Sequence, residues 1–138
     1  LPPPLTDPPP TALPPPLTLI ERSLALREQI YGPKHLDVGT TLAYLADLEQ
    51  KAERPAPAEA HALQAVAVLT DIPAGVLELG RARLVLARLR ARDPNHREAA
   101  RALAHQAVLD LRSEPQDTGP LAEARALLTD LSRRPGPP

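Results

Sequence analysis

The tripeptide Gln-Ala-Val occurs at residues 64–66 and again at 106–108, so the second copy begins 42 residues after the first. The same offset aligns Ser-Leu-Ala-Leu at 23–26 with Ala-Val-Ala-Val at 65–68. Stacked helical hairpins have such a period, because each hairpin buries its apolar face only against its neighbours. The repeat therefore predicts a short solenoid of antiparallel helical hairpins. A plain four-helix bundle, which needs no fixed period, is the alternative.

Composition favours an all-α fold. Only 1 % of the residues are aromatic, so Leu, Val, Ile and Ala must build the core. No stretch alternates apolar and polar residues with the β-branched content typical of strands. The spacing of the apolar residues predicts helices at about 17–31, 37–52, 57–70, 76–92, 95–112 and 120–134.

Capping residues indicate where these helices begin. Thr18 and Glu21 have the spacing of a capping box, and Asn95 stands three residues before Glu98 in the same way. Asp37 is a suitable N-cap for the second helix, and Pro57 suits the first position of the third. His35 is expected to close the turn after Gly32-Pro33.

A proline-rich arm precedes the helices. Residues 1–16 hold nine of the nineteen prolines, in three Pro-Pro-Pro runs, and residues 135–138 form a short Pro/Gly tail. Proline lacks the amide donor and has a fixed φ angle, so the arm favours polyproline II and excludes helix. The arm is either a stiff spacer or a ligand for an aromatic groove. The helical repeat domain is expected to span 17–134.

Residues 22–38 read Arg-Ser-Leu-Ala-Leu-Arg-Glu-Gln-Ile-Tyr-Gly-Pro-Lys-His-Leu-Asp-Val. This stretch resembles the repeat junction of tetratricopeptide repeat (TPR) proteins of the kinesin-light-chain type, which reads R-A-L-A-I-R-E-x-x-Y/L-G-x-x-H-P-D-V. The likeness covers 17–70 well, 76–112 moderately and 119–134 only as a capping helix. Glu49 stands where the family has an aromatic residue, and Leu36 where it has proline.

Residues 84–107 also resemble the C-terminal TPR tails of bacterial, especially myxobacterial, Ser/Thr protein kinases. That resemblance implies a larger bacterial signalling protein, of which this chain is a non-catalytic part. A cytoplasmic location is expected by default, because the sequence has no signal peptide and no membrane helix. None of the kinase signature motifs occurs in the sequence.

In TPR proteins the first helix of each hairpin lines a concave groove that binds a protein or peptide. The resemblance implies a groove made of Thr40, Ala43, Asp47, Gln50, Arg81, Leu84, Arg88 and Arg92. Arg81, Arg88 and Arg92 share one helix face, which favours an acidic or phosphorylated partner. An ordinary solvated arginine face is the alternative.

Other functions lack a sequence signal. The formal net charge of -1 argues against nucleic-acid binding, and no apolar run reaches the roughly 20 residues of a membrane helix. No nucleophile elbow, phosphate loop or metal-ligand spacing is present, so we expect no enzyme, cofactor or metal site. A protein-docking module is the leading hypothesis. A structural or homo-oligomerisation segment without a peptide ligand is the second, and an enzyme subdomain the third.

The helix at 17–31 resembles the second helix of a hairpin whose first helix is missing, and its apolar arc is wide. Something must cover that arc. We expect either that Leu5, Leu13 and the neighbouring prolines fold back on it, or that a second copy of the chain pairs there as a homodimer.

Overall fold

The computed structural model describes residues 15–114 and 119–133, and within these ranges it holds six α-helices, two 3₁₀ turns and no strand. The α-helices are α1 (Pro15–Tyr31), α2 (Leu36–Lys51), α3 (Pro55–Leu69), α4 (Val76–Ala91), α5 (Arg97–Leu111) and α6 (Gly119–Ser132). The 3₁₀ turns are η1 (Pro73–Gly75) and η2 (Pro94–His96). The all-α solenoid expected from the repeat is confirmed.

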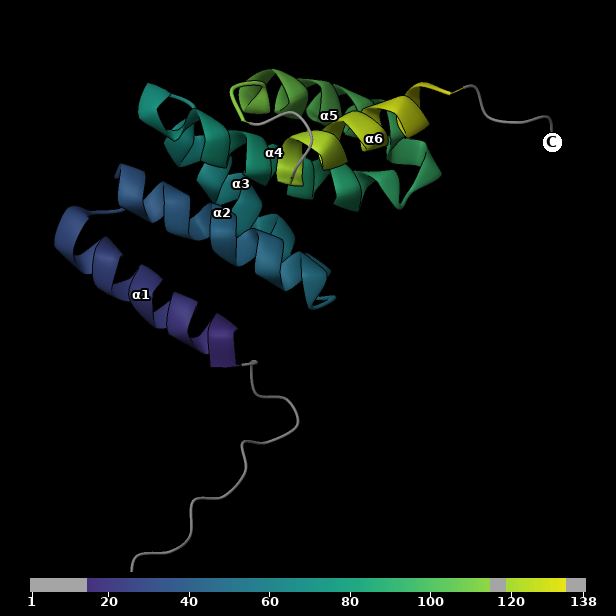
Figure 1. The fold of residues 1–138 in the computed structure, drawn as a ribbon. Coiled ribbons are helices and arrows are strands. Elements are labelled where there is room, and N and C mark those ends of the chain that lie inside the picture. Colours follow the sequence, from purple (N-terminus) through teal and green to yellow (C-terminus); the bar gives the residue numbers. More distant parts are fainter. Residues whose placement is uncertain (1–14, 115–118, 134–138) are drawn as a thin grey trace, which may run out of the picture.

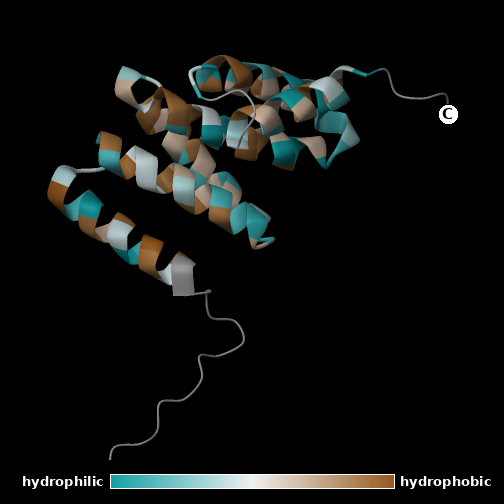
Figure 2. Cartoon of the chain, in the orientation of Figure 1, coloured by the Kyte–Doolittle hydropathy of each residue, from teal (hydrophilic) through white to brown (hydrophobic). Residues whose placement is uncertain are grey.

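The helices form two complete hairpins flanked by two further helices. α2 packs most extensively against α3, and α4 against α5. α4 also contacts α2 and α3 of the preceding hairpin, while α1 packs on α2 and α6 on α5 (Figure 1). α1 and α6 therefore lie at opposite ends of the stack. Hydrophobic and hydrophilic residues are mixed along each helix (Figure 2), as expected where every helix has a buried and a solvated side.

The repeat is visible in the core. Four residues of α3 are completely buried, and the residues 42 positions later in α5 are equally buried: Ala58, Ala62, Ala65 and Leu69 correspond to Ala100, Ala104, Ala107 and Leu111. Small side chains at the crossing let the two helices of each hairpin approach closely.

Glycines receive these leucines. A Cβ atom at Gly39 of α2 would lie 2.6 Å from Cδ2 of Leu69, and one at Gly80 of α4 would lie 2.7 Å from Cγ of Leu111. Both distances are shorter than non-bonded carbon contacts allow. The two hairpins thus share one packing device, a buried leucine against a glycine of the facing helix.

Three of the expected helix caps are wrong. The N-cap of α2 is His35, whose Nδ1 accepts a hydrogen bond from the amide of Asp37 at 3.1 Å. The His35 ring stacks on Tyr31 with centroids 4.4 Å apart, so this histidine does close the turn. Asp37 lies in the first helical turn, where its charge still favours the helix dipole.

The second wrong cap precedes α5. Asp93 accepts a hydrogen bond from the amide of Asn95 at 2.9 Å and starts η2, so Asn95 lies within the 3₁₀ turn and α5 begins only at Arg97.

The third wrong cap is the predicted capping box of Thr18 and Glu21. α1 begins at Pro15, so both residues lie inside the helix, and the arm that was predicted to exclude helix up to residue 16 gives way to helix at residue 15. α3 begins at Pro55, two residues before Pro57. Proline is well tolerated in a first helical turn, because the amides there have no intrahelical partner.

Candidate protein-docking groove

A hollow of about 240 Å³ opens between α2, α4 and the start of α6. Its lining comes from successive first helices of the hairpins: Asp47 and Lys51 of α2, Arg81 and Leu84 of α4, and Gly119, Pro120 and Glu123 of α6. We call this hollow, with the polar side chains bonded to its lining, the docking groove.

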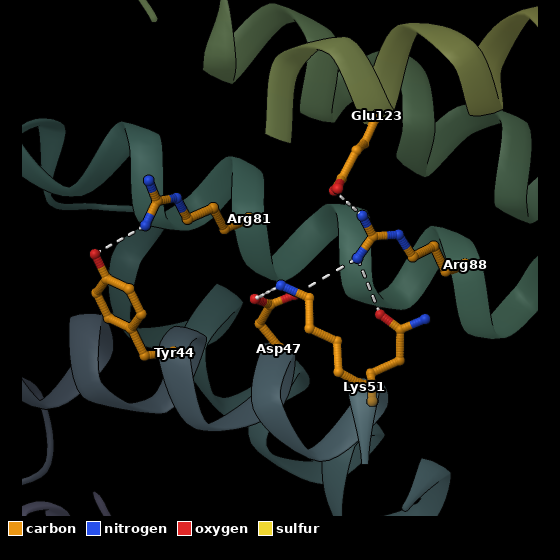
Figure 3. A network of polar contacts seen from close by, with 7 residues as sticks. Tyr44, Asp47, Lys51, Arg81, Arg88 and Glu123 are labelled. Carbon is orange, nitrogen blue, oxygen red and sulfur yellow. Dashed lines mark hydrogen bonds and ion pairs between the residues drawn. The ribbon is translucent and has the colours of Figure 1, made fainter. Parts of the chain in front are cut away.

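Arg88 connects three helices beside the hollow. Its Nη1 donates to Oε1 of Gln50 at 3.1 Å and lies 3.5 Å from a carboxylate oxygen of Asp47. Its Nη2 pairs with the carboxylate of Glu123 on α6. Figure 3 shows the guanidinium between the side chains of α2 and α6. Because the Arg88 side chain is only 22 % exposed, its charge is directed at these partners.

Arg81 is held in a similar way. Its Nη1 donates to the Tyr44 hydroxyl at 2.8 Å, and its guanidinium lies 5.2 Å from the centre of that ring (Figure 3). Its Nη2 donates to Glu114 at 3.2 Å. Burial by itself lowers the pKa of Arg81, but the bonds to Tyr44 and Glu114 outweigh it and raise the pKa above its usual range. Arg81 is therefore a permanent, anchored cation.

The charges of the groove balance. Lys51 pairs with Asp47 at 2.9 Å, in addition to the contacts of the two arginines. Three cations thus meet three anions: Lys51, Arg81 and Arg88 against Asp47, Glu114 and Glu123. The arginine row predicted from the sequence does not present unpaired cations at positions 81 and 88.

Most of the expected groove residues lie together. Asp47, Gln50, Arg81 and Arg88 share the network, and Leu84 lies at the base of the hollow, 2 % exposed.

The other three lie elsewhere. Thr40 lines a different hollow, between α1 and α2. Ala43 is completely buried and offers no surface, and Arg92 is an exposed C-cap of α4 that lies outside the network.

Sequence reasoning missed four members of the network: Tyr44, Glu114 and Glu123, which are partners of the arginines, and Lys51, which pairs with Asp47. The repeat could have predicted one of them as a groove residue. Glu123 lies 42 residues after Arg81 and so has the equivalent position in the next repeat. Tyr44 had a weaker signal, as one of only two aromatic residues in the chain.

Two further site types were sought in the described ranges. Residues 15–114 and 119–133 contain no group of three or more His, Cys, Asp or Glu side chains arranged to hold a metal ion. None of the helices in these ranges has the length and apolar character needed to cross a membrane.

Comparison with known proteins found a family model that matches the first part of the chain. Residues 17–71, which include α2, α3 and nearly all of α1, match the tetratricopeptide repeat family. A search of curated proteins found no match. Tetratricopeptide repeats are non-catalytic modules that generally mediate protein–protein interaction. The helical hairpin formed by α2 and α3 lies within the matched residues and is consistent with the match.

Proposed function

We propose that the docking groove binds a segment of a partner protein. The observation that carries the proposal is the convergence of α2, α4 and α6 on one hollow with fixed polar groups around an apolar base. Binding sites commonly have this form, in which a few oriented polar groups surround apolar surface. The apolar base is supplied by Leu84 and Pro120.

The partner segment that fits best is acidic, and one of its carboxylates replaces the carboxylate of Glu123 on Arg88. Arg88 is held from α2 by Asp47 and from α6 by Glu123, whose side chain is 51 % exposed. An exposed glutamate can turn into solvent at little cost, since surface ion pairs contribute only about 0–1 kcal/mol. A carboxylate of the partner then takes the place of Glu123 on a guanidinium that is already oriented.

The chain would serve this role within a larger bacterial signalling protein in the cytoplasm. The likeness of residues 84–107 to kinase tails supports such a parent, with the catalytic domain elsewhere in it. A structural segment without a peptide ligand is the second candidate. The exposed apolar side chains of α1 favour it, because they offer a surface for another chain.

The exchange predicts opposite effects for two substitutions. A fluorescein-labelled peptide of alternating glutamate and leucine is titrated with the protein, and Kd is read from fluorescence anisotropy. Arg88→Gln should weaken binding, because the guanidinium is lost. Glu123→Gln should tighten it, because the competing carboxylate is gone.

Arg90→Gln is the matched control. Like Arg88, Arg90 is an arginine of α4. Its carboxylate partner is Glu59 of α3 at 2.9 Å, and it does not line the hollow. Its substitution should leave Kd unchanged. A peptide with lysine in place of glutamate should not bind. If Glu123→Gln weakens binding of the acidic peptide, or if Arg88→Gln does not, the groove is not an acidic-segment site.

A further inference from the structure

The second hollow lies where the repeat calls for a helix. In α3 and α5 the side facing the hairpin mate includes residues 62, 65 and 69, and 104, 107 and 111. Subtracting 42 from the α3 positions gives Ile20, Ser23 and Arg27 of α1. These three residues and Thr40, Thr41 and Tyr44 of α2 line a hollow of about 270 Å³, which we call the open groove. It occupies the place of a hairpin mate for α1.

The apolar residues beside this groove are exposed. Leu19, Leu26 and Ile30 are 65 %, 58 % and 69 % exposed. The residue equivalent to Leu26 in α3 is Val68, which is partly buried against the core. Large apolar side chains at three positions of one helix side are costly to leave in water, so this side of α1 is suited to be covered.

The segment just before α1 stands in the sequence position that a hairpin mate would have. The hairpin mate of α3 is α2, which ends only four residues before α3 begins. Residues 1–14 precede α1 in the same way and end directly before Pro15. Seven of those fourteen residues are proline, which excludes a helix. Proline has no amide donor, so such a segment can cover apolar surface while leaving few donors unpaired.

The chemistry of the open groove matches such a segment. Polyproline segments bind where aromatic rings are exposed, and the Tyr44 ring is 46 % exposed at the groove. The groove also holds one cation, Arg27, whose Nη1 donates to the hydroxyl of the buried Thr41 at 2.9 Å. The segment 1–14 has a single acidic residue, Asp7.

The lengths agree as well. Pro15 and Arg27 are twelve residues apart, or roughly 18 Å along a helix at 1.5 Å per residue. Asp7 and Pro14 are seven residues apart, or roughly 22 Å in polyproline II at 3.1 Å per residue. After a reversal of direction at the start of α1, the carboxylate of Asp7 comes level with the guanidinium of Arg27.

We propose that residues 1–14 fold back along α1 and occupy the open groove as a polyproline segment, with Asp7 paired to Arg27. The segment then lies where the first helix of a hairpin would pack against α1. A second copy of the chain is the competing occupant, but the tether gives the arm an effective concentration on the order of millimolar, above that of a free second chain.

The test uses the absence of cysteine from the chain. A nitroxide is attached to a single cysteine in Thr6→Cys, and paramagnetic broadening of amide signals is measured on the ¹⁵N-labelled full chain. We expect loss of signal at Ser23, Arg27 and Tyr44. A nitroxide on Ser132→Cys, at the far end of the stack, should leave these signals intact.

A mixed sample separates the two occupants. In this sample the chain that carries the nitroxide contains no ¹⁵N, and it is mixed with a ¹⁵N-labelled chain that carries no nitroxide. Broadening that is seen only when the nitroxide and the ¹⁵N label are on the same chain supports the arm as the occupant of the groove. Broadening in the mixed sample assigns the groove to a second copy, and absence of broadening in both leaves the groove without either occupant; both results overturn the proposal.

The ion pair is tested separately. Asp7→Asn and Arg27→Gln should each reduce the broadening from position 6, and the double variant should reduce it no further than the singles. Arg22→Gln is the control, because Arg22 is an exposed arginine of the same helix that does not line the groove. Equal effects of Arg22→Gln and Arg27→Gln would refute the pairing.

Discussion

Leu69 provides a quantitative test of hairpin packing. Its side chain is fully buried between α2, α3 and η1, and it lies against both Gly39 and Gly75. Leu69→Ala removes a buried isobutyl group and leaves a cavity that rigid helices fill only in part. We expect the free energy of unfolding to fall by about 3–5 kcal/mol.

Gly39→Ala should have opposite effects in two backgrounds. In the wild type the new Cβ would stand 2.6 Å from Cδ2 and 2.7 Å from Cγ of Leu69, an overpacking cost of about 1–3 kcal/mol. Alanine gains about 1 kcal/mol over glycine in helix propensity, so the net change is about 0–2 kcal/mol of destabilisation. With Leu69→Ala the two closest atoms are gone, and Cγ1 of Val68, 3.0 Å from the new Cβ, can turn into the space that Leu69 leaves. The same substitution should then stabilise by about 1 kcal/mol.

Urea unfolding followed by circular dichroism measures all four corners of this cycle. The expected coupling between positions 39 and 69 is about 1–3 kcal/mol. The control repeats Gly39→Ala with Leu111→Ala, a leucine of the other hairpin, where the effect should equal that in the wild type. If Gly39→Ala changes stability by the same amount in the wild-type and Leu69→Ala proteins, the leucine–glycine contact does not set the packing of the hairpin.

Two further predictions concern ionisable groups. Glu49 is 1 % exposed, one of its oxygens lies 2.5 Å from Nδ1 of His61, and the other has no partner in the described part of the chain. His61→Ala should therefore cost about 1–3 kcal/mol in urea unfolding, and Glu49→Leu less, because it removes the buried polar group itself; the reverse order would refute this. The hydrogen bond from Arg90 holds the pKa of Glu59 below its usual range. The unfolded state then binds more protons in acid, so stability should fall as the pH drops below about 4.3, and Glu59→Gln should make that fall shallower.

The sequence predicted the fold because the repeat is carried by buried residues. The alanines and leucines of α3 recur in α5 at the same spacing, and packing forces them onto the same helix side in both hairpins. Helix starts were less predictable. Before α2 and before α5, polar residues two positions apart are both suitable caps, and the geometry of the loop decides between His35 and Asp37, or Asp93 and Asn95.

The sequence placed two arginines of the candidate groove on one helix face but did not give their partners. A helical wheel places Arg81 and Arg88 on one side of α4, which the structure also does. It cannot show that their partners come from positions more than 30 residues away, such as Glu114 and Glu123. Ion pairs between helices depend on how the hairpins stack, and a single-helix pattern contains no such information.

The two ends of the stack differ in a way that bears on both proposals. A solenoid needs polar terminal faces, because an end has no neighbour to cover it. α6 meets this need, since its exposed side carries polar residues such as Arg125, Thr129 and Asp130. α1 does not, since Leu19 and Ile30 are more exposed than any other large hydrophobic side chain of the described residues. The exposed side of α6 is thus polar and suited to water, whereas the exposed side of α1 is apolar and suited to be covered.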